Sequence, residues 1–228
     1  MILNFNQGIP VESCLALMSN NEKNALHSII TNLSDNSIVV EIGSHLGGSA
    51  CIMASVNPTI NINCIEMGHE HNILMWNNQK NFINTSINNW HIHFMQPITD
   101  NSYTYIKEMD DCFLNDGTGI EALKYVTKKY SNITVHRGLS PNDFLDWNQS
   151  IDLCFEDAIH LNPQLNLNLK FWCPHIKPGG YLVGHDYNEF CPDVVLEFNK
   201  LIQTGWSLIT KVDSLIILQK PNIIEGNI

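Results

Sequence analysis

The sequence predicts an α/β fold with a mostly parallel seven-stranded sheet, helices on both faces and an antiparallel hairpin strand near the C-terminus. Two observations support this prediction. Five short apolar or alternating runs are separated by segments of helical spacing, which is the pattern of successive αβ units. Two further runs, at 206–211 and 214–220, are joined so tightly that they must form an antiparallel hairpin. We therefore expect a mostly parallel sheet with an antiparallel edge strand.

The first half of the predicted sheet surrounds a glycine-rich loop. Residues 11–33 carry apolar positions at helical spacing and predict helix over the sheet, interrupted near 20–21. The β-branched run 38–42 predicts the first strand, and the apolar segment after the glycines predicts a helix. The alternating run 60–66 predicts the second strand, and 133–137 predicts the third.

The second half of the sheet follows the same pattern. Four segments complete the αβ units: a helix over 121–130, a strand over 151–157, a strand over 181–186 and a helix over 193–202. Between the fourth and fifth strands, Asn162 and Pro163 supply an N-cap and a first-turn proline for a helix that runs to Trp172. Residues 177–180, Lys-Pro-Gly-Gly, predict the turn that leads into the fifth strand.

Residues 77–115 exceed what one crossover helix between the second and third strands requires. The segment is rich in aromatic residues and has an alternating patch at 90–95, which argues against disorder. It predicts an inserted segment that serves either as a cap over the substrate or as a dimer contact. Sequence alone leaves both interpretations open.

Composition sets the class of protein. The chain has 228 residues, of which 44% are hydrophobic and 15% charged, so we expect one domain over 1–228 with a helical lead-in over 1–35. The net charge of −11 argues against binding to nucleic acid or to an anionic membrane. Neither a signal peptide nor a membrane-spanning run is evident, and the seven cysteines form no C-x-x-C pair, which favours a soluble cytoplasmic protein.

The loop after the first strand predicts a nucleotide-like ligand. Gly43 permits a sharp turn and a close approach by a ligand, and the next helix offers free N–H groups. Because Gly47 and Gly48 do not complete a G-x-G-x-x-G pattern, the pyrophosphate cradle of a dinucleotide site is missing. Glu41 would repel a phosphate but suit an ammonium group. The alternative is an ordinary βα turn that uses glycine for its geometry alone.

Two later segments extend this ligand site. Glu66 ends the second strand, where an acid in nucleoside-binding folds accepts hydrogen bonds from ribose hydroxyls; the alternative is a solvated strand-end acid. The loop that begins at Gly138 could line an adenine pocket.

Acidic residues end the fourth and fifth strands. Asp157 and Asp186 lie at the carboxyl edge of neighbouring strands, where two carboxylates could chelate one cation such as Mg²⁺. His185 is a further candidate ligand, but it converges with Asp186 only if the strand has already ended. His160 could act as a general base beside a cation-bound hydroxyl, although a capping or solvent-facing histidine is the alternative.

These motifs together resemble class I S-adenosylmethionine-dependent methyltransferases. The resemblance rests on V-E-I-G at 40–43 with G-G-S at 47–49, F-E-D-A-I-H at 155–160, K-P-G-G at 177–180 and G-H-D-Y at 184–187. Within that class the motifs are most similar to the metal-dependent sugar O-methyltransferases and the cephalosporin-biosynthesis methyltransferase-like proteins. The match covers most of residues 36–220 and leaves the inserted segment unmatched.

The resemblance implies a Rossmann-like fold, two cofactors and the site residues. It implies that S-adenosylmethionine is bound by Glu41, Gly43, Gly47, Ser49, Glu66, Gly138, Leu139, Ser140 and Asp157. It also implies that Mg²⁺ or another divalent cation is bound by Asp157 and Asp186, with His185 as a candidate third ligand, and that His160 and Asp157 are catalytic.

The resemblance further implies methyl transfer to a hydroxyl of a small molecule, which the family suggests is a sugar or similar polyol, in an enzyme that could form a homo-oligomer. Two departures stand out. His185 occupies a position that is usually acidic, so the metal preference could lean toward softer ions, and Glu156 replaces a usual apolar residue.

Two other classes of function remain open from the sequence. A nicotinamide-dependent oxidoreductase would share the α/β architecture, but the missing G-x-G-x-x-G pattern argues against it. A catalytically silent protein of methyltransferase fold could bind a partner through the inserted segment. The joint presence of Glu41, Glu66, Asp157, His160 and Asp186 argues against that alternative.

Overall fold

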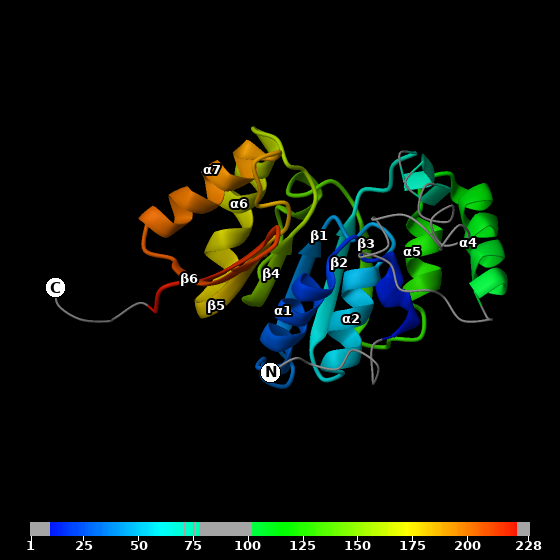
Figure 1. Ribbon diagram of the computed structural model, residues 1–228, viewed down its shortest axis with the longest axis horizontal. Helices are drawn as coiled ribbons and strands as arrows, with labels where there is room; N and C mark the ends of the chain where they lie inside the picture. The colour runs from blue at the N-terminus through cyan, green and yellow to red at the C-terminus, as the bar shows by residue number, and fades with distance from the viewer. Residues whose placement is uncertain (1–9, 71, 75, 78–101, 223–228) are drawn as a thin grey trace.

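The computed structural model describes residues 10–70, 72–74, 76–77 and 102–222, and their core is one seven-stranded sheet (Figure 1). The strands are β1 (Ile38–Ile42), β2 (Asn61–Glu66), β3 (Ile133–Arg137), β4 (Ile151–Glu156), β5 (Ile176–Gly184), β6 (Ser207–Val212) and β7 (Leu215–Gln219). Their order is β3-β2-β1-β4-β5-β7-β6. The five strands from β3 to β5 in this order form four parallel pairs, while β7 is antiparallel to both β5 and β6.

This topology confirms the predicted mostly parallel sheet with a C-terminal hairpin. The antiparallel strand is nevertheless not the edge strand, because β7 lies between β5 and β6. The hairpin therefore returns inward, and β6 forms the edge of the sheet in the described part of the chain. Strand β7 has four consecutive buried residues, as expected for the hairpin strand that has a neighbour on each side.

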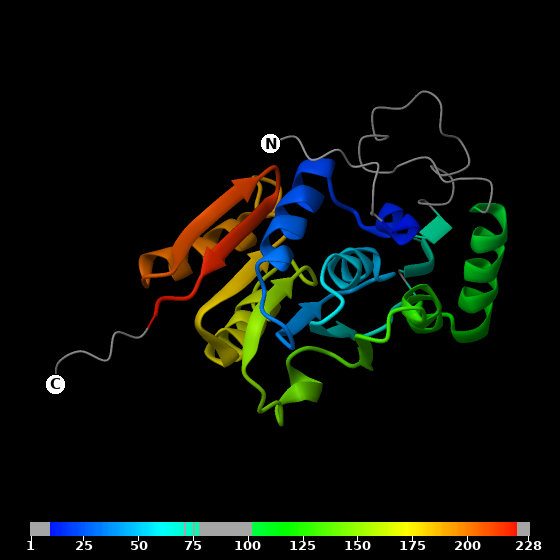
Figure 2. The ribbon, with the colours of Figure 1, turned by 90° about the horizontal axis from the view of Figure 1, so that it is seen from below.

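Helices cover both faces of the sheet (Figure 2). They are η1 (Val11–Leu15), α1 (Asn20–Thr31), α2 (Gly48–Val56), α4 (Ser102–Asp116), α5 (Ile120–Thr127), η3 (Asn142–Phe144), α6 (Gln164–His175) and α7 (Pro192–Gln203). Helices α1 and α2 lie on one face, and α6 and α7 lie on the other. None of these described helices combines the length and apolar character that crossing a membrane requires.

The two cores follow from the alternation of side chains along the strands. On β1, Val39 packs in one cluster with Leu26 of α1 and Met53 of α2. The next residue, Val40, faces the opposite layer and packs in a second cluster with Trp172 of α6 and Phe198 of α7. Because both faces of the central strands are covered, their sequences are nearly continuous apolar runs.

Helix α1 begins with a capping box, which explains where the predicted helical lead-in is interrupted. Ser19 Oγ accepts a hydrogen bond from the N–H of Glu22, and the Glu22 carboxylate accepts one from the N–H of Ser19 at 2.7 Å. The break therefore falls just before Ser19, slightly earlier than predicted. Ser19 Oγ also donates to Asp213 Oδ2 at 2.6 Å, which ties the start of α1 to the β6–β7 turn.

Helix α6 differs from its prediction at both ends. Pro163 occupies the N-cap, so the first helical residue is Gln164 and not Pro163. Asn162 still contributes, because its Oδ1 accepts a hydrogen bond from the N–H of Asn166 at 3.1 Å. The helix continues past Trp172 and ends at His175, since a proline so close to the C-terminal end removes only one helical hydrogen bond.

Strand β5 begins earlier and ends earlier than predicted. It starts at Ile176 and includes the expected turn 177–180, whose extra length is taken up by a register shift against β4. It ends at Gly184, and β4 ends at Glu156. Asp157, His185 and Asp186 therefore follow their strands rather than lie in them.

Helix α4 is the described part of the predicted inserted segment. It packs against α5 beside the β3 edge of the sheet (Figure 1). Trp76 is fully buried between these elements, where it stacks on Phe113 and donates to Asp110 Oδ1 at 2.7 Å. Residues 78–101, with the alternating patch at 90–95, lie outside the described residues, so the cap and the dimer contact both stay predictions.

Candidate active site

Loops at the carboxyl ends of β1 to β4 surround a cavity of about 580 Å³, which we call the central cavity. Its lining includes seven of the residues implied by the sequence: Gly43, Glu66, Gly138, Leu139, Ser140, Asp157 and His160. A volume of this size suits a nucleoside-sized ligand, and the carboxyl edge of a parallel sheet is where α/β folds bind ligands.

Gly43 joins the loop after β1 to the loop after β4. Its φ angle of 86° lies in the left-handed region, and a Cβ there would lie 2.4 Å from the carbonyl oxygen of Asp157 and 2.6 Å from Ala158 Cα. Its N–H donates to the carbonyl oxygen of Ile65 at 2.9 Å. Glycine is therefore required here both for backbone conformation and for close contact between two loops.

Glu41, Gly47 and Ser49 lie beneath this loop and are not in the lining of the central cavity. Ser49 Oγ donates to Glu41 Oε1 at 2.5 Å, and both side chains are buried. Burial raises the pKa of Glu41 to about 7, which hydrogen bonds from the serine side chains only partly offset. Gly47 is the N-cap of α2 with a φ of 80°. The structure thus places these residues as supports of the loop, and their contact with a cofactor stays a prediction.

Glu66 is held rigidly at the wall of the central cavity. Its carboxylate accepts hydrogen bonds from the main-chain N–H of His45 at 2.9 Å and of Gly68 at 3.0 Å. The side chain of Asn72 approaches it at 3.5 Å. These donors fix the orientation of the carboxylate, which has the placement expected for a ribose ligand. Asn72 was not predicted from sequence, because no local motif marks it.

The loop 138–140 is supported by a buried polar network. Ser140 Oγ donates to Asn168 Oδ1 at 3.1 Å and accepts from Trp172 Nε1 at 2.8 Å. Asn168 Nδ2 in turn donates to Glu156 Oε1 at 3.1 Å. Burial raises the pKa of Glu156 to about 8, so this side chain is largely a neutral acid at pH 7. The unusual Glu156 therefore orients Asn168, which lines the central cavity.

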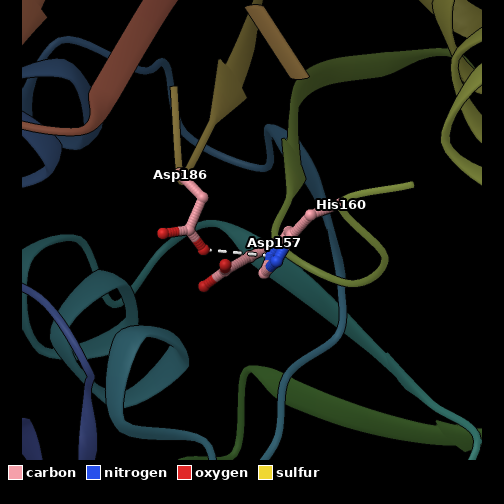
Figure 3. Close-up of side chains that lie close together, drawn as sticks. All are labelled: Asp157, His160 and Asp186. Atoms are coloured by element: carbon pink, nitrogen blue, oxygen red, sulfur yellow. Dashed lines mark ion pairs between the residues drawn. The ribbon is translucent and has the colours of Figure 1, made fainter. Parts of the chain in front are cut away.

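Asp157, His160 and Asp186 form what we call the acidic cluster (Figure 3). Each offers one ligand atom, and these atoms all lie within 4.8 Å of one another. His160 Nε2 is 3.0 Å from Asp186 Oδ2. The hydrogen bond between them raises the pKa of His160 and lowers that of Asp186. The predicted base and two predicted metal ligands are thus brought together, and two of the three residues, Asp157 and His160, line the central cavity.

His185 lies behind the acidic cluster. Its Nδ1 is 3.3 Å from Asp157 Oδ1 and 3.4 Å from Asp186 Oδ2, and its Nε2 is 3.4 Å from Glu22 Oε2. Burial would lower the pKa of His185, but the charge of Asp157 and hydrogen bonds to Asp157, Asp186 and Glu22 raise it to about 12. Because β5 ends at Gly184, His185 and Asp186 meet the condition for converging on one site.

Glu22 was not predicted as part of this site. It lies 163 residues from His185 in the sequence, and the capping box marks only the start of a helix. Its contact with His185 depends on how α1 docks against the sheet, which local sequence does not encode.

The residues of the acidic cluster fit a divalent cation. Two carboxylates and an imidazole lie close enough to bind one ion, and Asp157 and Asp186 are only partly exposed. His185 Nδ1 lies 3.3 Å from Asp157 Oδ1 and 3.4 Å from Asp186 Oδ2, and its role as a further ligand stays a prediction. The donor set is therefore mixed oxygen and nitrogen, which is wider than the two aspartates alone would provide.

The chain belongs to the methyltransferase-domain family, whose model matches residues 40–187. It is a class I S-adenosylmethionine-dependent methyltransferase, and the matched segment contains every residue of the acidic cluster and the glycine loop.

Solved structures with the same fold include three methyltransferases. A putative caffeoyl-CoA O-methyltransferase from Staphylococcus aureus is 16% identical, with 90% of this chain and 85% of that chain covered and a TM-score of 0.56. The O-methyltransferase NovP is 15% identical, with coverages of 89% and 80% and a TM-score of 0.55. A putative methyltransferase from Streptococcus mutans in complex with SAH is 12% identical, with coverages of 89% and 99% and a TM-score of 0.50. No curated protein sequence matches the chain significantly.

Proposed function

We propose that this protein transfers the methyl group of S-adenosylmethionine to a hydroxyl group of a small molecule, with the help of a divalent cation. The observation that carries the proposal is that Asp157 and His160 of the acidic cluster line the central cavity, beside loops suited to a nucleoside. A base and two carboxylates in this place can prepare a hydroxyl for attack on a methyl donor.

The cofactor would lie along the loops of β1, β2 and β3. Gly43, which lines the central cavity and lets the loop after β1 contact the loop after β4, would lie beside the methionine part. Glu66 would accept hydrogen bonds from the ribose, since its orientation is already fixed by main-chain donors. Leu139 and Ser140 would flank the adenine. S-adenosylmethionine supplies a methyl group that its sulfonium has already activated.

Asp157 and Asp186 would hold the cation, and His160 would accept the proton of the hydroxyl. A divalent cation in this position lowers the pKa of a hydroxyl beside it. His160 Nε2 lies 3.0 Å from Asp186 Oδ2, and once a cation occupies that carboxylate, Nε2 would be free to accept the proton of the hydroxyl. As the O–CH₃ bond forms, the S–CH₃ bond breaks, the hydroxyl proton moves to His160, and S-adenosylhomocysteine is left as the second product.

The acceptor would be a sugar or similar polyol. Two proteins with the same fold are described as O-methyltransferases, which supports oxygen as the acceptor atom. The sugar class rests on the resemblance of the sequence motifs to sugar O-methyltransferases. The acidic net charge of −11 supports a small-molecule acceptor over nucleic acid, and we place the protein in the cytoplasm.

Calorimetric titration of the purified protein with S-adenosylmethionine and with NAD, each with and without Mg²⁺, tests the cofactor. We expect S-adenosylmethionine to bind and NAD not to bind. Transfer of a radiolabelled methyl group to a panel of sugars, before and after chelation of divalent ions, then tests the reaction.

The chelated enzyme should lose transfer and regain it when the metal is restored. The matched variants Asp157→Asn and Asp146→Asn separate the acidic cluster from an exposed aspartate elsewhere, and only the first should lose activity. A folded protein that binds neither cofactor would contradict the proposal and favour a partner-binding protein of methyltransferase fold.

A further inference from the structure

Glu22 is a buried carboxylate that neither the glycine loop nor the acidic cluster accounts for. It lies in the first turn of α1, outside residues 40–187 that match the family, and it is 2% exposed. A glutamate at this position of a capping box is ordinarily at the surface, where it needs only the N–H of the N-cap residue. The burial of Glu22 requires further partners.

Those partners converge on both carboxylate oxygens. Oε1 accepts hydrogen bonds from Ser214 N at 2.8 Å and from Ser214 Oγ at 2.6 Å. Oε2 accepts from Ser19 N at 2.7 Å and lies 3.4 Å from His185 Nε2. The cap of α1 and the β6–β7 turn thus hold the carboxylate in one orientation, with Oε2 beside His185.

This contact fixes which nitrogen of His185 is turned toward the acidic cluster. A carboxylate can only accept, so His185 Nε2 carries the proton that it shares with Glu22. The opposite ring nitrogen, Nδ1, is then the one directed at Asp157 and Asp186, to which it donates until a cation bound by these carboxylates takes the place of its proton. Histidines that bind metals usually donate their other ring N–H to a carboxylate in this way, and loss of that carboxylate weakens metal binding by roughly 10–100-fold.

We propose that Glu22 is a positioning residue that presents His185 Nδ1 as a nitrogen ligand beside Asp157 and Asp186, so that the site selects Mn²⁺ over Mg²⁺. The inference deepens the proposed function, since it rests on the cation site assigned there. Mg²⁺ binds almost entirely through oxygen, whereas imidazole suits transition metals, so a histidine fixed in this orientation favours the latter.

The test is metal binding by the full chain without S-adenosylmethionine. Calorimetry would compare MnCl₂ and MgCl₂ binding to the wild type and to Glu22→Gln, whose single oxygen cannot satisfy donors on both sides. We expect Mn²⁺ affinity to fall at least about 10-fold while Mg²⁺ affinity changes less than about threefold. Pulsed electron paramagnetic resonance of bound Mn²⁺ should show coupling to imidazole nitrogen from His185 in the wild type and lose it in the variant. His185→Ala, which leaves the nitrogen of His160, identifies the His185 part of that coupling.

Asp213→Asn is the matched control. Asp213 also ties the start of α1 to the β6–β7 turn, through Ser19 Oγ, but it does not contact His185. This variant should loosen the same docking contact while keeping both Mn²⁺ affinity and the nitrogen coupling. Circular dichroism would confirm that both variants fold.

Three results would overturn the inference: wild-type Mn²⁺ affinity in Glu22→Gln, equal losses in Glu22→Gln and Asp213→Asn, or wild-type Mn²⁺ without coupling to His185. Failure of the proposed function is separate from all three. A protein that binds Mn²⁺ through His185 but transfers no methyl group would uphold this inference and contradict the proposed function.

Discussion

The two sides of the candidate active site are built in different ways. The side formed by the loops after β1, β2 and β3, which we call the glycine half, positions its groups through main-chain contacts. Glu66, for example, is oriented by the main-chain N–H groups of His45, in the loop after β1, and of Gly68, two residues further along the chain. The side formed by the loops after β4 and β5, the acidic half, consists of charged side chains that hold one another.

The acidic half also draws on distant parts of the chain. His185 contacts Asp157, Asp186 and Glu22, and Glu22 is held in turn by Ser214. A backbone-built site tolerates substitution of the surrounding side chains, whereas a site built from opposed charges changes when any member is removed. From this difference we predict that the glycine half governs cofactor affinity and that the acidic half governs the rate of transfer.

The largest expected effect is a loss of turnover, without a loss of cofactor affinity, when the acidic half is changed. His160→Ala should lower kcat about 10²–10⁴-fold, because it removes the group that accepts the proton. The dissociation constant for S-adenosylmethionine should change less than about threefold. Steady-state kinetics and calorimetry measure the two quantities, and His27→Ala on the exposed face of α1 is the control. Equal losses of turnover and cofactor affinity would refute the division.

The contact between the halves can be broken at one position. Gly43→Ala should destabilise the fold by roughly 3–5 kcal/mol, since a left-handed φ and a clash with the Asp157 carbonyl add together. Gly117→Ala is the control, because Gly117 has a φ of 66° but no atom within 4 Å of an added Cβ. For Gly117→Ala, urea unfolding should show that the free energy of unfolding falls by only about 1–2 kcal/mol. Similar losses at both glycines would argue against a tight contact between the loops.

The buried Glu41 beneath the glycine half can be tested through the pH dependence of the free energy of unfolding. The pKa of Glu41 is raised from 4.5 to about 7, so the folded protein binds its proton more tightly than the unfolded chain. The resulting stability is fully present below pH 4.5 and is lost as pH rises through about 7. Glu41→Gln should therefore match the wild type near pH 4.5 and exceed it by about 3 kcal/mol at pH 8.

Urea unfolding across pH 4–8 measures that difference. Glu156 titrates in the same direction in both proteins, so comparing the two curves removes its contribution. Parallel curves for wild type and Glu41→Gln would show that Glu41 is not buried as a titrating acid.

The smallest expected effect concerns the cofactor alone. Glu66→Gln keeps the shape of the side chain but replaces one acceptor oxygen with a donor, and should weaken S-adenosylmethionine binding by about 10-fold, or roughly 1.4 kcal/mol. Turnover at saturating cofactor should stay close to wild type. Calorimetry and kinetics with saturating cofactor test this. A large fall in turnover would contradict the assignment of Glu66 to cofactor binding alone.

The same difference explains what the sequence could predict. Strands β1 and β3 were predicted to the residue, because β-branched runs between polar segments define strands locally. Gly43, Glu66 and Gly138 were placed correctly at the cavity, since each follows or ends a strand whose carboxyl end is known.

Residues that join the site through helix docking could not be predicted. Asn72 and Asn168 reach the cavity from helical segments, and Glu22 reaches His185 from α1. Such contacts depend on the rotation and depth of a packed helix, which short-range patterns do not specify. The sequence predicted that His185 and Asp186 converge only if the strand ends before them. In the structure β5 ends at Gly184, so this condition is met.

Because the β6–β7 turn supports only the acidic half, the two halves of the site are completed at different points of chain synthesis. The glycine half is complete once β4 and α6 have been made, because Gly43 packs on the loop after β4 and Ser140 is held by Asn168 and Trp172 of α6. The acidic half must wait for Ser214, because that residue holds Glu22 against His185. The acidic half is therefore the last part of the site for which every supporting residue has been synthesised, since its outer support comes from residue 214 of 228.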